Sequence, residues 1–170
     1  MTLERNVLAV ARAIQDDVHA ELGPPEEGLV SATQSVVALS LVRGTRGYIE
    51  RVANQANGAY ENGWYDACAV MIRRLLETLI IEVFEHHRLA ASIKGASGDF
   101  LRLGDLIDRC LQEPSWNLSR DCKRAMPRLK GIGDKSAHSR RFNAHRGDID
   151  SVLADVRLVL QELVYLAGLK

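Results

Sequence analysis

The chain has 170 residues, and its 22 basic and 22 acidic side chains give a formal net charge of zero, which argues against a general nucleic-acid coat protein. This length suits one domain, and an apolar content of 46% is enough to form a core. The three cysteines have no CxxC spacing, and no apolar run reaches the roughly 18 residues of a membrane span, so we expect a cytoplasmic protein without disulfides, zinc knuckle or membrane contact.

Apolar residues recur at three- and four-residue steps along most of the chain, which predicts helices and no strands. The first helix is expected over residues 3–22, before a Gly-Pro-Pro run, with no signal-peptide pattern in it. A second helical region runs from about residue 29 to residue 60, as one bent helix or as two, because Gly44 and Gly47 are weak points. Residues 65–89 have the widest apolar stripe, which is typical of the central helix of a bundle.

Shorter elements are expected in the next part of the chain. Residues 94–99 predict a loop, and residues 100–111 predict a short helix that ends before a proline. Ser119 is expected to cap a fifth helix that runs through Leu129 and is kinked or shortened by Pro127.

The last part of the chain completes the predicted fold. Residues 130–147 are rich in turn-forming residues, and Asp148 is expected to cap the final helix. Together these elements predict an all-α, antiparallel helical bundle of five to six helices in a single domain, with residues 1–45 as an added N-terminal helical arm.

Positive charge is concentrated in residues 120–146, which contain nine of the 22 Lys and Arg residues and only two acids. Like charges at this density repel each other, and an anion such as a phosphate backbone relieves the repulsion. The alternative is a solvated face whose compensating acids come from other helices. The side chains predicted to bind nucleic acid are Arg124, Arg128, Lys135, Arg140, Arg141 and Arg146.

Two patterns are interpreted as structural features. Residues 131–136 look like a phosphate-binding loop, but the positions that this motif requires to be glycine hold Asp134 and Leu129. His86 and His87 end the long third helix, where capping of free carbonyl groups is favoured over metal binding. We therefore predict no metal site and no cofactor.

His138 and His145 lie among the cations of residues 120–146. A histidine can move a proton while Arg or Lys holds the phosphoryl oxygens, and this chemistry can cleave RNA through its own 2′-hydroxyl group without a metal. The alternative is that each is a surface or interface histidine with a structural role.

Residues 57–77 form the first of two ordered motifs. They contain a glycine turn, a helix with small residues and then Arg-x-x-Leu-Glu, in which the arginine is Arg73 or Arg74 and the glutamate is Glu77. The simplest structural role for this arginine is an ion pair with Glu77 within the helix.

Residues 130–138 form the second motif, which follows the pattern Arg-x-x-Gly-Asn-x-x-Ala-His with two exceptions. Lys130 stands at the Arg position and Asp134 at the Asn position, whereas Gly133 and His138 match the pattern. On these two motifs, residues 48–168 resemble HEPN-type helical domains, and more narrowly a branch of unknown function that is often attached to restriction-type defence proteins. The resemblance implies a structural role for Gly133 and a homodimer.

HEPN ribonucleases use an Arg followed a few residues later by His, placed at a dimer interface so that two copies line one RNA cleft. The resemblance therefore implies a catalytic site in which His138 is the general acid or base, Lys130 and Arg140 or His145 stabilise the phosphorane, and Asp134 orients a side chain. The chain departs from the family pattern, because Lys130 and His138 are too far apart in sequence. Arg140 and His145 have the family spacing but follow the motif.

Two alternatives to the ribonuclease remain. Many HEPN-like proteins are non-catalytic dimerisation or interaction modules with a protein partner in a bacterial defence or toxin–antitoxin system. The second alternative is nucleotide binding, for which Trp116 and Phe142 are the aromatic residues close in sequence that could stack on a base.

Overall fold

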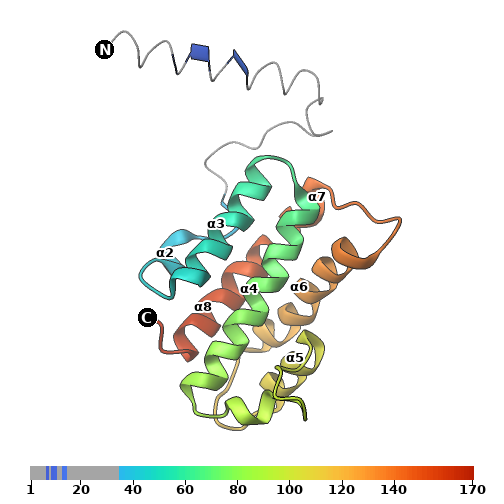
Figure 1. The fold of residues 1–170 in the computed structure, drawn as a ribbon. Coiled ribbons are helices and arrows are strands. Elements are labelled where there is room, and N and C mark those ends of the chain that lie inside the picture. The colour runs from blue at the N-terminus through green and yellow to red at the C-terminus, as the bar shows by residue number, and fades with distance from the viewer. Residues whose placement is uncertain (1–6, 8, 11–12, 15–34) are drawn as a thin grey trace.

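The computed structural model describes residues 7, 9–10, 13–14 and 35–170. Within these residues seven α-helices, α2 to α8, and one short 3-10 helix pack together without a β-strand (Figure 1). The predicted all-α class is therefore confirmed, but the described residues form more helices than the five to six that the sequence predicted. None of the described helices is long and apolar enough to cross a membrane.

The second helical region is divided into two helices, α2 (Leu39–Val42) and α3 (Gly47–Glu61). Gly44, whose φ of +79° favours glycine, turns the chain between them. Asn57 on α3 then fixes the chain ahead of α2, because its side chain accepts from the Val37 amide at 2.8 Å and donates to the Val37 carbonyl at 2.9 Å. This buried pair of hydrogen bonds satisfies both ends of the Asn57 side-chain amide.

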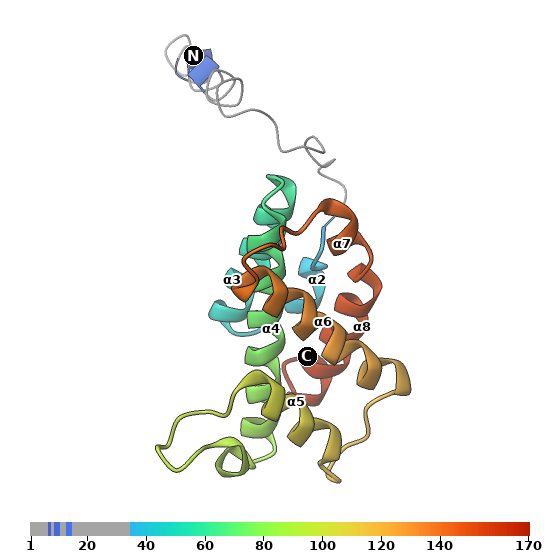
Figure 2. The same cartoon turned by 90° about the vertical axis from the view of Figure 1, so that its right-hand side faces the viewer.

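The central helix of the bundle is α4 (Tyr65–His86), as the apolar stripe predicted. It packs against α3, α5, α6, α7 and α8. In Figure 1 α4 lies between α3 and α6, and Figure 2 shows α6 beside α8. The helix ends before residue 89, and a 3-10 helix, Ala90–Ile93, follows it. The ring of His87 lies 3.2 Å from the carbonyl oxygen of Leu166, so this histidine contacts the end of α8.

The next two helices are α5 (Leu103–Gln112) and α6 (Arg120–His138). Ser119 caps α6 as predicted, since its hydroxyl oxygen accepts from the Cys122 amide at 3.1 Å. The predicted end of this helix near Leu129 was wrong, because α6 continues through Pro127 and through the first nine residues of the expected turn-rich stretch.

Packing explains why α6 continues. Leu129, Ile132 and Gly133 are buried against the rest of the bundle, whereas Pro127 lies on the exposed side of the helix. Burial of this face offsets the weak helix propensity of glycine and the hydrogen bond that proline cannot donate.

The C-terminal part contains an additional short helix, α7 (Arg146–Asp150), before α8 (Leu153–Leu166). The prediction that Asp148 caps the final helix was wrong. Asp148 lies inside α7, where its carboxylate accepts from the amide of the N-cap residue His145 at 2.9 Å. The N-cap of α8 is Val152, which provides no side-chain cap. Asp148 cannot cap α8 because the rest of α7 and the residues after it separate Asp148 from the first residue of α8.

The packed core begins earlier in the chain than the predicted arm boundary at residue 45. Val36, Val37 and Val42 are fully or almost fully buried in it. Most of the helix predicted over residues 3–22 lies outside the described residues. The described residues of this segment are helical, and Val7, Val10 and Ile14 expose more than half of their surface.

Candidate functional site

Acidic residues neutralise part of the positive charge in residues 120–146. Arg128 on α6 forms an ion pair of 2.9 Å with Asp155 on α8, and Arg146 forms one of 3.5 Å with Asp150 within α7. For Arg128 the compensating acid comes from another helix, as the solvated-face alternative expects, whereas the acid that pairs with Arg146 lies on the same helix.

Asp134 joins the two sequence motifs. It accepts a hydrogen bond of 2.7 Å from Nε of Arg73 on α4 and another from Nζ of Lys130 one turn earlier on α6. Of the two candidate partners of Glu77, Arg73 forms the pair, with a distance of 3.6 Å between Nη1 and Oε2. These half-buried side chains form a chain of alternating charge, Glu77–Arg73–Asp134–Lys130, between α4 and α6.

The ionisation of Asp134 reflects this network. Burial on its own would raise the pKa of the carboxyl group, but the hydrogen bonds and positive charges of Lys130 and Arg73 outweigh burial and hold the pKa below its usual value. Asp134 is therefore a carboxylate at neutral pH, and it orients Lys130 and Arg73 toward itself.

Gly133 lies at the closest approach of α6 to α4. A Cβ atom at this position would be 2.5 Å from Cβ of Arg73, which is closer than packed atoms approach, and 3.0 Å from the carbonyl oxygen of Ala69, which is a tight contact. The glycine of the second motif therefore permits helix packing. The expected turn-rich stretch therefore does not begin at residue 130, because both Gly131 and Gly133 lie within α6.

His138 is the last residue of α6 and is exposed. Its spacing from Lys130 and Asp134 is two turns and one turn, so the continuous helix places the three in one row. Within the part of the chain that the structure describes, His138 forms no hydrogen bond or ion pair with them, whereas Lys130 and Asp134 contact each other. The structure thus aligns the predicted catalytic residues of α6 without joining His138 to the network.

The loop between α6 and α7 presents two further arginines. Arg140 and Arg141 are exposed, and neither forms an ion pair with any described residue. The loop is tied to the first turn of α4, because Asp66 accepts a hydrogen bond of 3.0 Å from the Ala144 amide. His145 follows as the exposed N-cap residue of α7.

A cleft of about 320 Å³ lies between α6, this loop, α7 and the residues that join α7 to α8. Two cations, Arg128 and Lys135, line it together with the carboxylate of Asp148, and Nζ of Lys135 is 5.8 Å from the ring centre of Phe142. The other lining residues are Gly131, Ile132, Ser151 and Val152. The cleft therefore carries both positive and negative charge. His138 does not line it.

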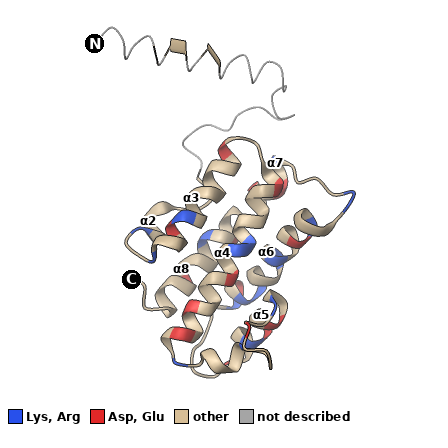
Figure 3. Cartoon of the chain, viewed as in Figure 1, with Lys and Arg blue, Asp and Glu red and all other residues tan. Residues whose placement is uncertain are grey.

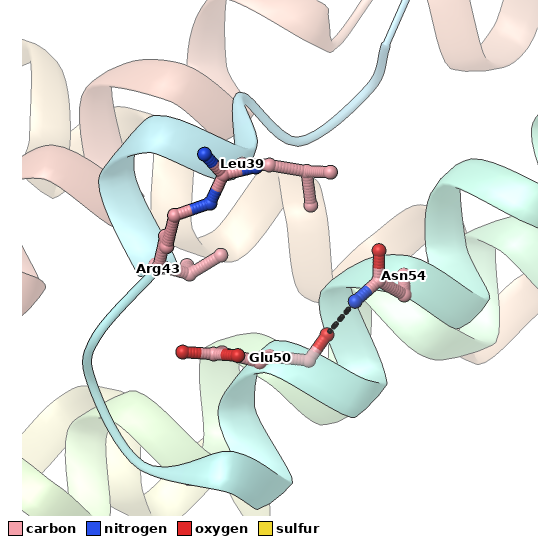
Figure 4. A pocket seen from close by; sticks show the side chains of 5 residues that line it. Leu39, Arg43, Glu50 and Asn54 are labelled. Atoms are coloured by element: carbon pink, nitrogen blue, oxygen red, sulfur yellow. Dashed lines mark hydrogen bonds between the residues drawn. The ribbon is translucent and has the colours of Figure 1, made fainter.

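A second hollow, of about 210 Å³, lies between α2 and α3 (Figure 4). Arg43 and Glu50 contribute opposite charges to it, and the Asn54 side chain donates to the Glu50 carbonyl oxygen at 2.9 Å. Because the charges cancel, this hollow does not select an anion.

The described residues contain no group of three or more His, Cys, Asp or Glu side chains that could hold a metal ion. Burial raises the pKa of the thiols of Cys68, Cys110 and Cys122 to about 12 in each case, so they are protonated and weakly nucleophilic at neutral pH.

Two residues that shape the site carried no signal in the sequence. Asp66 and Asp155 reach the basic segment from other helices, and their distance along the chain gives no periodic pattern that could identify them. No family model, curated protein or solved structure matches this chain. Function is therefore inferred from the chemistry of the site itself.

Proposed function

We propose that this chain is a HEPN-like helical protein that binds single-stranded RNA through the cations of α6 and of the loop between α6 and α7. The observation that carries the proposal concerns three arginines spread along α6 and the loop that follows it, Arg124, Arg140 and Arg141. These side chains are exposed, and none of them has an acidic partner among the residues that the structure describes. Exposed guanidinium groups without counter-charges bind phosphate groups well.

The shape of this surface favours a single strand over a duplex. On α6, Arg124, Arg128, Gly131 and Lys135 follow one another at helical spacing, and a Cβ atom at Gly131 would have no neighbour within 4 Å. Lys135 also lies over the half-buried ring of Phe142, beside the cleft. On this face the cations without an acidic partner among the described residues are Arg124 and Lys135, and such cations with a neighbouring aromatic ring suit an unpaired strand, whose bases are free to stack.

RNA binding is better supported than RNA cleavage. The resemblance assigns Lys130 to the phosphorane, but the ammonium group of Lys130 is neutralised by Asp134, which Arg73 also holds. A paired cation stabilises a developing charge less than an unpaired one does. RNA binding is therefore the proposed function, and RNA cleavage by His138 is a separate hypothesis.

Two further parts of the proposal come from the resemblance alone. They are that two copies of the chain associate, and that the protein works with a partner in a bacterial defence or toxin system. The non-catalytic interaction module is the second form of the same proposal, since a dimer without cleavage activity can still present this basic surface.

Binding is tested with a labelled single-stranded RNA over a series of salt concentrations. Each phosphate contact releases counterions, so the logarithm of the affinity should fall linearly with the logarithm of salt concentration. The double variant Arg140→Glu/Arg141→Glu should weaken binding and reduce the slope by about 1.4, because each lost contact with a single strand accounts for about 0.7.

A matched control keeps the change in net charge constant. Arg109 on α5 and Arg157 on α8 are exposed and lie outside residues 120–146, so Arg109→Glu/Arg157→Glu should leave the slope unchanged. Equal effects of the two double variants on RNA affinity, or an affinity that does not depend on salt concentration, would contradict the proposal.

A further inference from the structure

A third hollow, of about 170 Å³, lies where α3 packs against α4. Arg51 on α3 and Arg74 on α4 line it, together with the side-chain amide of Gln55. The other lining residues are Tyr48, Val52 and Thr78. No acidic residue lines this α3–α4 hollow, which distinguishes it from the two clefts described above.

The acids closest in sequence to this hollow have other partners. Glu77 pairs with Arg73, and Glu82 accepts from the Tyr48 hydroxyl and lies 3.6 Å from Arg46. Glu50 accepts from the Gly44 amide at 2.6 Å.

Arg51 and Arg74 are both exposed, and in the described ranges of the chain neither has an ion-pair partner. Consecutive residues of a helix point about 100° apart, so α4 directs Arg73 to α6 and Arg74 to α3. Of the two arginines in the first motif, Arg73 belongs to the charged chain between α4 and α6, and Arg74 does not.

We propose that Arg51 and Arg74 form a second anion-binding site, which takes a phosphate group of the RNA strand whose other phosphates contact the α6 surface. The inference rests on the proposed RNA binding and extends the bound strand from α6 across α4 to α3. In Figure 3 Lys and Arg segments on α3, α4 and α6 follow one another across the bundle, with α4 in the middle.

The chemistry of the hollow favours a phosphate that belongs to a polymer. Two guanidinium groups from neighbouring helices and one amide donor match the oxygen atoms of a phosphodiester. The hollow is small and both arginines remain in solvent, so a free nucleotide keeps most of its hydration and gains little. A strand that already contacts α6 reaches the hollow at a high effective concentration.

The test compares neutral variants of the two arginine pairs in the full chain, with RNAs of about 4 and about 16 nucleotides. Arg51→Gln/Arg74→Gln should weaken binding of the longer RNA and reduce its salt slope by about 1.4, while leaving the shorter RNA unaffected. Arg51→Lys/Arg74→Lys keeps the charge and should retain the slope, which separates loss of charge from damage to α3 or α4.

The outcomes distinguish this site from the proposed function. If Arg140→Gln/Arg141→Gln weakens binding and Arg51→Gln/Arg74→Gln does not, the second site is absent, and RNA binding by α6 and the loop that follows it stands. If the parent protein binds both RNAs without salt dependence, both proposals fail. Adenosine monophosphate serves as the free phosphate source, and binding as tight as that of the longer RNA would overturn the assignment to a polymer.

Discussion

At the scale of single residues, Asp134 determines which cations of α6 are available to a ligand. It binds Lys130 and Arg73 at once, and its lowered pKa keeps it charged at neutral pH. Asp155 neutralises Arg128 in a similar way from α8. Cations farther along the chain, such as Arg140 and Arg141, keep their charge available, and they follow the exposed His138 closely in sequence.

The catalytic hypothesis is tested at His138. If this residue transfers a proton during RNA cleavage, His138→Ala should reduce the cleavage rate by about 10²-fold or more, because general acids and bases act on the transition state. RNA affinity should hardly change. Since His138 is exposed and has no partner among the described residues, the free energy of unfolding should change by less than about 0.5 kcal/mol.

The products give an independent readout of the same hypothesis. They should end in a 2′,3′-cyclic phosphate, a chelator should have no effect, and 2′-deoxy substrates should resist cleavage. His145→Ala, measured in parallel, decides between the two histidines. A parent protein that cleaves no RNA leaves the non-catalytic interaction module.

At the scale of helices, the contact between α4 and α6 connects the two motifs. Gly133 allows the helices to approach, and the Arg73–Asp134 pair links them through partly exposed side chains. Gly131 lies only two residues earlier, but a Cβ atom added to it would meet nothing within 4 Å, so it takes no part in the contact. The two glycines of one helix therefore have different roles.

This difference predicts opposite effects of the same substitution. Gly133→Ala should destabilise the protein by about 1–3 kcal/mol, since its Cβ would overlap Cβ of Arg73 and force the helices apart. Gly131→Ala should stabilise it by up to about 1 kcal/mol through higher helix propensity. Urea unfolding of both variants measures the change in the free energy of unfolding. A higher urea midpoint for Gly133→Ala than for the parent protein would show that the close approach of α4 and α6 does not require glycine at this position.

At the scale of the whole molecule, apolar side chains remain exposed around the bundle. Trp64 and Tyr165 expose 64% and 76% of their surface, and the described residues Val7, Val10 and Ile14 expose more than half of theirs. Contiguous patches of such groups are typical of surfaces that another chain covers, whereas single exposed apolar side chains are common on monomers. The proposal of a homodimer therefore rests on the resemblance.

Sedimentation tests this expectation directly. At micromolar concentration the protein should sediment with about twice the monomer mass of 18.8 kDa, because a closed two-fold pair is the commonest form of homo-oligomer. A clean monomer would remove the shared RNA cleft and leave an RNA-binding surface within one copy.

The helical class, the central position of α4 and the Ser119 cap of α6 could all be predicted from the order of the amino acids. These features depend on the period of apolar residues and on side chains that act within one turn. The concentration of cations in residues 120–146 was equally visible, because charge density is a property of the sequence. Which of these cations pair with acidic residues could not be predicted.

Packing between helices, in contrast, determines how α6 ends, which cations are neutralised and which arginine meets Glu77 and Asp134. Residues 127–133 resemble a helix end locally, because proline and glycine have low helix propensity, but burial against α4 outweighs that cost. Arg73 and Arg128 meet Asp134 and Asp155 on other helices, and such pairs depend on contacts between distant parts of the chain.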